Sequence, residues 1–270
     1  MVMRPRLRLR SPWDGHVLLL HSGEDERQAR TTAWARRGLE LGECVLHADG
    51  PEGARLLDAL TRRGVDVGAA AAGGLLVAVR EERLADPEAR RELAAEALEA
   101  GYPGVRLETP FTPERPVLIP AQSEAERDAQ ELCRSGRVSV LCKGDRTRAR
   151  GMLLRSAVAS HPDGVRVGIL SACPSQESLI LSGEADMSVT DVLGAALHAV
   201  LAAARGVAWV DVADLRFLDV ACARAMVHAT RSFRADGGTV VLLDARPPVR
   251  HVLHMLGLDA LGGFTLLGPS

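Results

Sequence analysis

The chain has few of the residue types that carry out covalent chemistry, and they are widely spaced. Lys143 is the only lysine among the 33 basic residues, so a Schiff base or a phosphate-binding lysine has a single candidate. The five cysteines form no C-x-x-C pair, none has an evident histidine partner, and no G-x-S-x-G motif is present. The sequence therefore predicts no enzyme active site and no disulfide framework. The cysteines are Cys44, Cys133, Cys142, Cys173 and Cys222.

Two pairs of histidines are close enough along the chain to be considered as metal ligands. His16 and His21 lie five residues apart on a predicted strand, so their side chains point to opposite faces of the sheet. His251 and His254 are spaced i, i+3 on a predicted helix, but the spacing places no carboxylate or cysteine beside them. We expect no metal site and no bound cofactor.

Nucleotide chemistry is disfavoured by the motifs that the chain lacks. A phosphate loop needs a Gly-Lys pair after a strand, and the chain contains no such pair. Glu24, Asp25 and Glu26 follow the first predicted strand, where three carboxylates would repel a triphosphate. No G-x-G-x-x-G motif stands between a strand and a helix. The sequence therefore favours a protein that binds without catalysis.

Charge and composition exclude two further classes of protein. The net charge of −2 argues against a nucleic-acid-binding protein, which usually carries a basic excess. No uninterrupted apolar run approaches the roughly 18 residues of a membrane span, and the arginine-rich start of the chain lacks the apolar stretch of a signal peptide. We therefore expect a cytoplasmic protein. With 47% hydrophobic but only 3% aromatic residues, its core must be built from Ala, Val and Leu.

Apolar strands alternate with amphipathic helices along the whole chain, which predicts an α/β fold with a mostly parallel sheet. In the first half, strands are expected at 17–21, 44–47, 75–79, 105–107 and 138–141, and helices at 24–41, 52–63, 87–100, 124–133 and 148–159. In the second half, strands are expected at 179–181, 207–212, 239–243 and 264–267, and helices at 189–205, 220–234 and 247–255. Residues 171–178, rich in Ser and Pro, are predicted to be a linker.

Four ordered sequence blocks in the second half resemble those of STAS domains, the fold of anti-sigma-factor antagonists; the last two lie between Gly237 and Asp259. LILSGEADM at 179–187 resembles the opening strand and its G-E-x-D turn. VAWVDVADLRFLD at 207–219 resembles the central strand. The stretch from Gly237-Gly238 to the LGLD block at 256–259 resembles the closing part of the family. The resemblance implies a STAS domain at 175–270.

The STAS resemblance implies a surface that binds a partner protein. In such antagonists the turn after the central strand carries a serine that a kinase-like anti-sigma factor phosphorylates, and Ala221 stands at that position here. Asp219 is expected to cap the following helix, and Ser188 and Thr190 to cap the helix starting near residue 191. The candidate partner-binding residues are Asp186, Met187, Ser188, Asp219, Val220, Ala221, Cys222 and Arg224.

The first half is similar to the MEDS sensory domains of bacterial regulators, over residues 14–166. The similarity rests on five blocks: Gly15-His16, the acidic residues 24–26, RGLELGE at 37–43, EAGYPGVR at 99–106 and CKGDR at 142–146, with His161-Pro162 closing the domain. It implies a RecA-like, three-layer parallel-sheet domain without a phosphate loop, which senses a small organic ligand. The ligand-sensing candidates are His16, Glu24 and Asp145.

We therefore hypothesise a non-enzymatic bacterial signalling regulator. Its STAS domain would bind an anti-sigma factor or another STAS protein, and Ala221 would prevent switching by phosphorylation at that position. One alternative is a small-molecule sensor whose STAS half serves dimerisation or scaffolding, so a homodimer is a further form to be tested. Another is an enzyme with polar groups converging near His16, Glu24 and Asp145.

Overall fold

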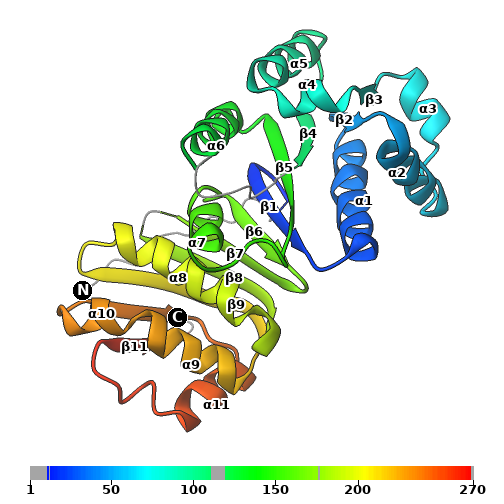
Figure 1. Ribbon diagram of the computed structural model, residues 1–270. Helices are drawn as coiled ribbons and strands as arrows, with labels where there is room; N and C mark the ends of the chain where they lie inside the picture. Colours follow the sequence, from blue (N-terminus) through cyan, green and yellow to red (C-terminus); the bar gives the residue numbers. More distant parts are fainter. Residues whose placement is uncertain (1–10, 12, 111–118, 176, 269–270) are drawn as a thin grey trace. The chain divides into compact units, whose positions relative to one another are not determined.

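The computed structural model describes residues 11, 13–110, 119–175 and 177–268. The chain divides into two compact units, which we call the N-terminal unit (Trp13–Ala149) and the C-terminal unit (Arg150–Ser270). The predicted alternation of strands and helices is present in both units, so the α/β class is confirmed (Figure 1). Each unit is described below by itself.

The N-terminal unit is a parallel sheet with helices on both faces. Its five strands lie in the order β1-β5-β4-β2-β3, and every neighbouring pair is parallel. Helices α1 and α2 cover one face of this sheet, and α4, α5 and α6 cover the other (Figure 1). The strands are β1 His16–His21, β2 Cys44–Ala48, β3 Leu76–Val79, β4 Val105–Pro110 and β5 Val138–Asp145. The helices are α1 Glu24–Glu40, α2 Gly50–Arg62, α3 Val67–Ala72, α4 Glu81–Ala85, α5 Pro87–Glu99 and α6 Ile119–Cys133.

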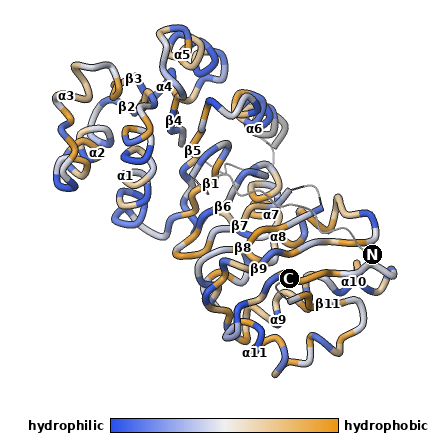
Figure 2. Tube along the Cα trace, turned by 180° about the vertical axis from the view of Figure 1, so that it is seen from behind, coloured by the Kyte–Doolittle hydropathy of each residue, from blue (hydrophilic) through white to orange (hydrophobic). Residues whose placement is uncertain are grey.

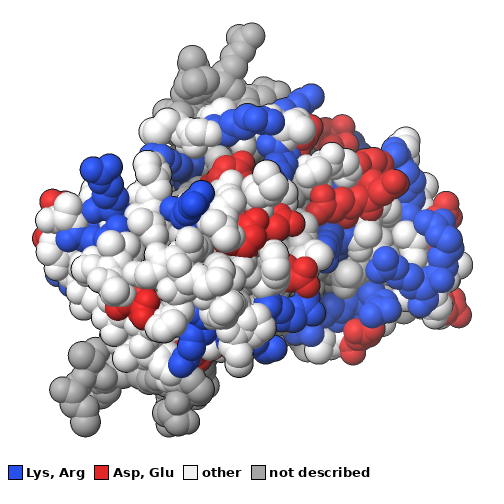
Figure 3. All heavy atoms as spheres, turned by 90° about the horizontal axis from the view of Figure 1, so that it is seen from below, with Lys and Arg blue, Asp and Glu red and all other residues white. Residues whose placement is uncertain are grey.

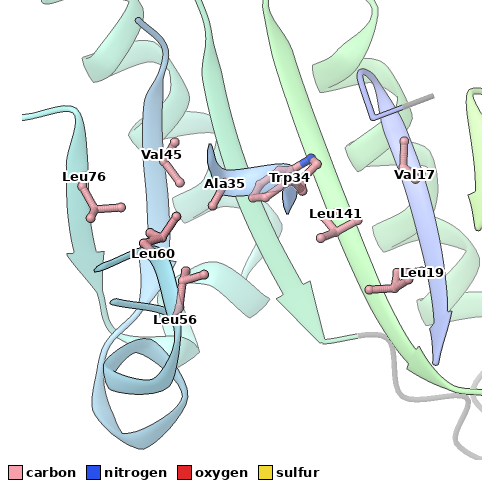
Figure 4. Packing of buried hydrophobic residues seen from close by; sticks show 9 residues of the cluster. All are labelled: Val17, Leu19, Trp34, Ala35, Val45, Leu56, Leu60, Leu76 and Leu141. Atoms are coloured by element: carbon pink, nitrogen blue, oxygen red, sulfur yellow. The ribbon is translucent and has the colours of Figure 1, made fainter. Parts of the chain in front are cut away.

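The core of the N-terminal unit forms because its central strands are apolar on both faces. Val17 and Leu19 of β1 point to the face covered by α1, where they join Leu141 of β5. Trp34 of α1 is only 1% exposed and lies over these strands (Figure 4). The cluster consists of Val17, Leu19, Trp34, Ala35, Val45, Leu56, Leu60, Leu76 and Leu141. Figure 2 shows hydrophobic (orange) stretches along the strands, interrupted by hydrophilic residues.

A buried arginine connects the amino ends of β1, β2 and β4. Arg106 of β4 has no exposed surface, and its guanidinium donates to Asp14 Oδ1 at 2.7 Å and to Glu43 Oε2 at 2.5 Å. It also lies 5.4 Å from the ring centroid of Trp34. The close approach of α1 requires a glycine at position 38, because a Cβ there would be 2.5 Å from the Arg106 Cδ. This ion cluster holds three strands and α1 together.

The C-terminal unit is a mixed sheet with the strand order β6-β7-β8-β9-β10-β11. The β6–β7 and β7–β8 pairs are antiparallel, whereas β8, β9, β10 and β11 are parallel to one another. Helices α7, α8 and α9 lie side by side (Figure 1). The strands are β6 Gly164–Val167, β7 Leu170–Pro174, β8 Ser178–Ala185, β9 Val207–Leu218, β10 Thr239–Leu243 and β11 Phe264–Leu267. The helices are α7 Gly151–Ala159, α8 Thr190–Ala203, α9 Val220–Ala229, α10 Arg231–Ala235 and α11 Pro247–Met255, with a short 3-10 helix, η2, at Met187–Val189.

Two predictions for the C-terminal unit are wrong. The expected linker at 171–178 contains most of β7, and Ala172 of that strand pairs with Leu181 of β8. The expected single helix at 220–234 is interrupted at Thr230, whose hydroxyl donates to the Met226 carbonyl oxygen at 2.8 Å. Both differences arise from hydrogen bonds that composition does not reveal.

The surface agrees with the nearly neutral composition. Figure 3 shows acidic and basic side chains interspersed with uncharged residues on the face in view. Among the described helices, each is too short or too polar to cross a lipid bilayer.

We predict that Arg106→Met lowers the free energy of unfolding by about 3 kcal/mol, because it leaves the Glu43 carboxylate partly buried without its cation and removes one of the two arginines that pair with Asp14. The measurement is urea unfolding followed by the fluorescence of the tryptophans. The control is Arg134→Met, which removes an exposed pair with Glu131 and should change stability by less than about 0.5 kcal/mol. Equal effects of the two substitutions would contradict the role given to Arg106.

Candidate functional site

The predicted partner-binding residues of the C-terminal unit lie at one end of two paired strands. Ala185 at the end of β8 is paired with Leu218 at the end of β9. The Asp219 amide donates to the Ala185 carbonyl oxygen at 3.0 Å, so the turns that follow the two strands lie side by side. The structure therefore brings residues 186–188 and 219–222 together, although more than thirty residues separate them in the sequence.

Both turns are fixed by an aspartate and by a thiol. Asp219 Oδ1 accepts a hydrogen bond from the Cys222 amide at 2.7 Å, which confirms the predicted cap of α9. Asp186 Oδ1 accepts from the Ser188 amide at 2.8 Å and from the Ser188 hydroxyl at 2.5 Å. The Cys222 thiol donates to the Asp186 carbonyl oxygen at 3.0 Å. These bonds hold the ends of β8 and β9 in one arrangement.

The capping role expected for Ser188 and Thr190 is wrong. The Ser188 hydroxyl donates to Asp186, and the Thr190 hydroxyl donates to the Met187 carbonyl oxygen at 3.2 Å. Residue 189 stands at the N-cap position of α8 and has no capping side chain, because η2 occupies the approach to that helix. Ser188 and Thr190 therefore stabilise the turn before the helix.

Large apolar side chains are exposed around these turns. Met187 is 74% exposed, Phe217 is 47% exposed and Val220 is 39% exposed. Phe217 is paired in register with Glu184, two residues before Asp186. We call the surface formed by residues 186–188, Phe217 and residues 219–222 the partner surface. The sequence analysis missed Phe217. No local signal in the sequence marks its exposure, because the face that it occupies depends on how far β8 and β9 pair.

Two residues of the partner surface have unreactive side chains. Ala221, the second residue of α9, has a methyl group and no hydroxyl. Burial, and then the negative charges of Asp219 and Asp186, raise the pKa of the Cys222 thiol to about 12. The thiol therefore stays protonated at neutral pH and acts as a hydrogen-bond donor.

Arg224 lies one turn after Val220 on the exposed side of α9. It also lines an open groove of about 890 Å³ between α9, α10 and the segment after α11. The groove combines basic and apolar side chains, including Arg231 and Leu258. Arg224 therefore connects the partner surface with this basic groove.

The three ligand-sensing candidates of the N-terminal unit are not brought together. His16 is at the amino end of β1, whereas Glu24 follows its carboxyl end, about 16 Å away along the strand. Glu24 forms exposed ion pairs with Arg27 and Arg55. Asp145 at the end of β5 accepts hydrogen bonds from the amide and hydroxyl of Thr147. A single site containing His16, Glu24 and Asp145 is not formed.

His16 instead belongs to a buried group of polar side chains. Its Nε2 atom lies 3.3 Å from the Cys142 Sγ and 3.1 Å from Glu126 Oε2, and its Nδ1 atom lies 3.2 Å from Gln130 Oε1. His16 has no exposed surface and Cys142 is 2% exposed. The expectation that no cysteine has a histidine partner is therefore wrong. No spacing rule reveals this pair, because its members are 126 residues apart on neighbouring strands.

The only lysine of the chain is buried and forms ion pairs. Lys143 of β5 is 8% exposed, and its ammonium donates to Glu52 and, at 3.1 Å, to Glu108 Oε2. The other oxygen of Glu108 accepts from the Ala48 amide at 2.9 Å, which ties β2 to β4. The charge of Lys143 is thus compensated by two carboxylates, one from β4 and one from α2.

Comparisons with known protein families assign each half of the chain to a domain family. Residues 15–162 match the family model described as "MEDS: MEthanogen/methylotroph, DcmR Sensory domain", and residues 170–267 match the model described as "Mlab, STAS domain". The first match spans more than half of the 270 residues, and the chain belongs to the MEDS family. The predicted combination of a MEDS and a STAS domain is confirmed.

Several solved structures are similar to about a third of the chain. An anti-sigma factor antagonist from Mycobacterium paratuberculosis is 22% identical, over 37% of this chain and 85% of its own, with a TM-score of 0.31. A putative anti-sigma factor antagonist from Thermotoga maritima is 16% identical, over 35% of this chain and 83% of its own, with a TM-score of 0.30. The antagonist SpoIIAA in its unphosphorylated form is 21% identical, over 34% and 82%, with a TM-score of 0.29. The comparison with curated proteins gave no match.

We predict that Asp219→Ala lowers the free energy of unfolding of the C-terminal unit by about 1 kcal/mol, because the Cys222 amide loses its capping acceptor. The measurement is urea unfolding followed by far-UV circular dichroism. Asp219→Asn should recover most of the loss, since an asparagine side chain also caps helices. An unchanged midpoint in Asp219→Ala would contradict the capping role.

Proposed function

We propose that this protein is a non-enzymatic signalling regulator whose STAS domain binds another signalling protein through the partner surface. The partner is a kinase-like anti-sigma factor or a second STAS protein. The MEDS domain senses a small organic ligand and thereby changes the availability of the STAS domain. This proposal joins the two domain assignments to the residues that lie at the ends of β8 and β9.

The observation that carries the proposal is the exposed apolar group of Met187, Phe217 and Val220 on a rigid frame. Aromatic residues and methionine are enriched at protein interfaces. Apolar side chains that stay exposed to water do not stabilise the folded chain, so a group of them indicates an interaction site. Asp186 and Asp219 hold the surrounding turns through backbone hydrogen bonds, so little conformational entropy is lost on binding. The position of this surface is the one that the STAS resemblance implies for partner contact.

Control of the partner surface must act without phosphorylation at the usual position, because Ala221 has no hydroxyl group. A phosphate at a helix start is stabilised by the helix dipole and by free amides. In this chain the Asp219 carboxylate already accepts from the Cys222 amide at that start. We therefore assign control to ligand occupancy of the MEDS domain and not to a phosphate on α9.

The direct test is binding of the purified full chain to candidate anti-sigma factors and STAS proteins, measured by isothermal titration calorimetry. We expect Met187→Glu and Phe217→Glu each to weaken binding at least tenfold, because a carboxylate would be desolvated at the interface. Met255→Glu is the matched control: Met255 is 63% exposed at the end of α11, outside the partner surface, and its substitution should leave binding unchanged.

Binding that the two partner-surface variants do not weaken would contradict the proposal. Self-association of the wild-type chain that both variants abolish, without binding to any candidate partner, would favour a dimerising STAS half. Analytical ultracentrifugation of wild type and variants separates these outcomes.

We predict that an anti-sigma kinase that binds the wild-type chain transfers no phosphate to it, and that Ala221→Ser creates an acceptor. The serine hydroxyl would stand in the first turn of α9, where a phosphate is stabilised. Incubation with labelled ATP followed by peptide mass spectrometry measures the transfer. Ala225→Ser, one turn further along α9, is the control. Phosphate on Ser188 or Thr190 of the wild type would show that phosphorylation does control this surface.

A further inference from the structure

Three side chains with metal-binding atoms converge on the face of the N-terminal sheet that α6 covers. They come from three elements: His16 from β1, Glu126 from α6 and Cys142 from β5. Each residue offers one ligand atom, and these atoms all lie within 4.8 Å of one another. The Glu126 side chain is 11% exposed and the other two are almost fully buried. Nitrogen, oxygen and sulfur thus surround one small volume shielded from solvent.

The sheet register explains why these residues meet. Parallel pairing places His16 opposite Val140 and Leu18 opposite Cys142. Alternate residues of a strand share a face, so His16 and Cys142 lie on the same side of neighbouring strands. Val17, Leu19 and Leu141 point to the opposite face and join the core beneath α1. Helix α6 packs on both β5 and β1 and brings Glu126 to the remaining side.

The spacing of the ligand atoms agrees with a tetrahedral ion. Zinc lies about 2.0 Å from nitrogen or oxygen ligands and about 2.3 Å from sulfur. Tetrahedral geometry therefore separates a nitrogen from an oxygen by about 3.3 Å and a nitrogen from a sulfur by about 3.5 Å. The observed separations are 3.1 Å for His16 Nε2 to Glu126 Oε2 and 3.3 Å for His16 Nε2 to Cys142 Sγ. Shifts of a few tenths of an ångström would admit the ion.

Gln130 orients the histidine for this role. The Nδ1 atom of His16 lies 3.2 Å from Gln130 Oε1, one turn along α6 from Glu126. A proton on Nδ1 donates to this oxygen and leaves the Nε2 lone pair directed toward Glu126 and Cys142. Histidine ligands of metals commonly make such a second hydrogen bond, which fixes the tautomer and the ring orientation.

Charge balance also favours a divalent cation. A divalent ion deprotonates a coordinating thiol. One thiolate, one carboxylate and one neutral imidazole then neutralise the two positive charges of the ion. The buried group would carry no net charge.

We propose that His16, Glu126 and Cys142 form a binding site for a divalent metal ion of the zinc class, with Gln130 as the orienting residue. Sulfur and nitrogen ligands select zinc and related transition metals, whereas magnesium and calcium require oxygen ligands. The site goes beyond the proposed binding function, and neither domain assignment provides it. It places a metal in the domain proposed to sense a small molecule.

The first experiment measures metal binding to the full chain. Protein treated with a chelator and then dialysed against Zn²⁺ should retain one ion per chain by elemental mass spectrometry. Co²⁺ in place of Zn²⁺ should give the near-ultraviolet absorption of a cobalt–thiolate bond, and added Zn²⁺ should remove it. Metal affinity should fall as the pH is lowered, because protons compete for the cysteine and histidine ligands.

Conservative substitutions with matched controls identify the ligands. Cys142→Ser should abolish the cobalt–thiolate band, and Cys44→Ser, a change at another buried cysteine of the same sheet, should retain it. Glu126→Gln should weaken binding more than tenfold, and Glu131→Gln, an exposed position on α6, should have no effect. Gln130→Leu should keep the band but lower the affinity about 10–100-fold. Circular dichroism checks that each variant is folded.

The proposal is overturned if the wild-type chain binds no stoichiometric metal, or binds cobalt without the thiolate band. These two results need no variant, so a misfolded substitution cannot hide them. It is also overturned if Cys142→Ser retains the band or if Cys44→Ser loses it to the same extent. Absence of metal binding would leave a buried histidine–carboxylate pair and would not bear on partner binding by the STAS domain.

Discussion

The buried guanidinium of Arg106 is the constraint on which the N-terminal unit depends. Burying a cation without counter-charges costs several kcal/mol. The chain must therefore fold so that carboxylates lie beside this arginine. Asp14 and Glu43, which precede β1 and β2, provide them, and Trp34 of α1 covers the group. The hydrogen bonds from Arg37 and Arg106 outweigh the effect of burial and keep the pKa of Asp14 below its usual value. The amino ends of three strands are thereby held together, with α1 packed against them.

The same ion pairs also affect the buried polar group that contains His16. Asp14 lies two residues before His16, so the ion pair that fixes the start of β1 also fixes which face His16 occupies. In the C-terminal unit two aspartates have a comparable effect. Asp186 and Asp219 hold the turns after β8 and β9. The exposed Met187 and Phe217 therefore lie on a backbone that is already ordered before a partner binds.

The long, regular elements were predictable because their signals are local. Helix α1 ends within one residue of its predicted end, and β10 and α11 match their predicted bounds. Some short or polar elements were not predicted, among them α3, α4, β6 and β7. The serine- and proline-containing β7 forms because β8 supplies hydrogen bonds, and β9 extends to Leu218 because β8 continues beside it. The candidate site was predictable where the turn chemistry is local, as for Asp219. It was not predictable for Phe217, whose exposure depends on where the sheet ends.

The sequence by itself determined the alternation of strands and helices, the lack of a phosphate loop, the family blocks and the methyl group at position 221. These properties follow from side-chain types and from hydrogen bonds within a few residues. Only the tertiary structure decided that His16, Glu126 and Cys142 meet, and that Glu24 and Asp145 lie at the far end of their strands. Strand register and helix docking set those distances, and both depend on packing between segments that are far apart in the chain.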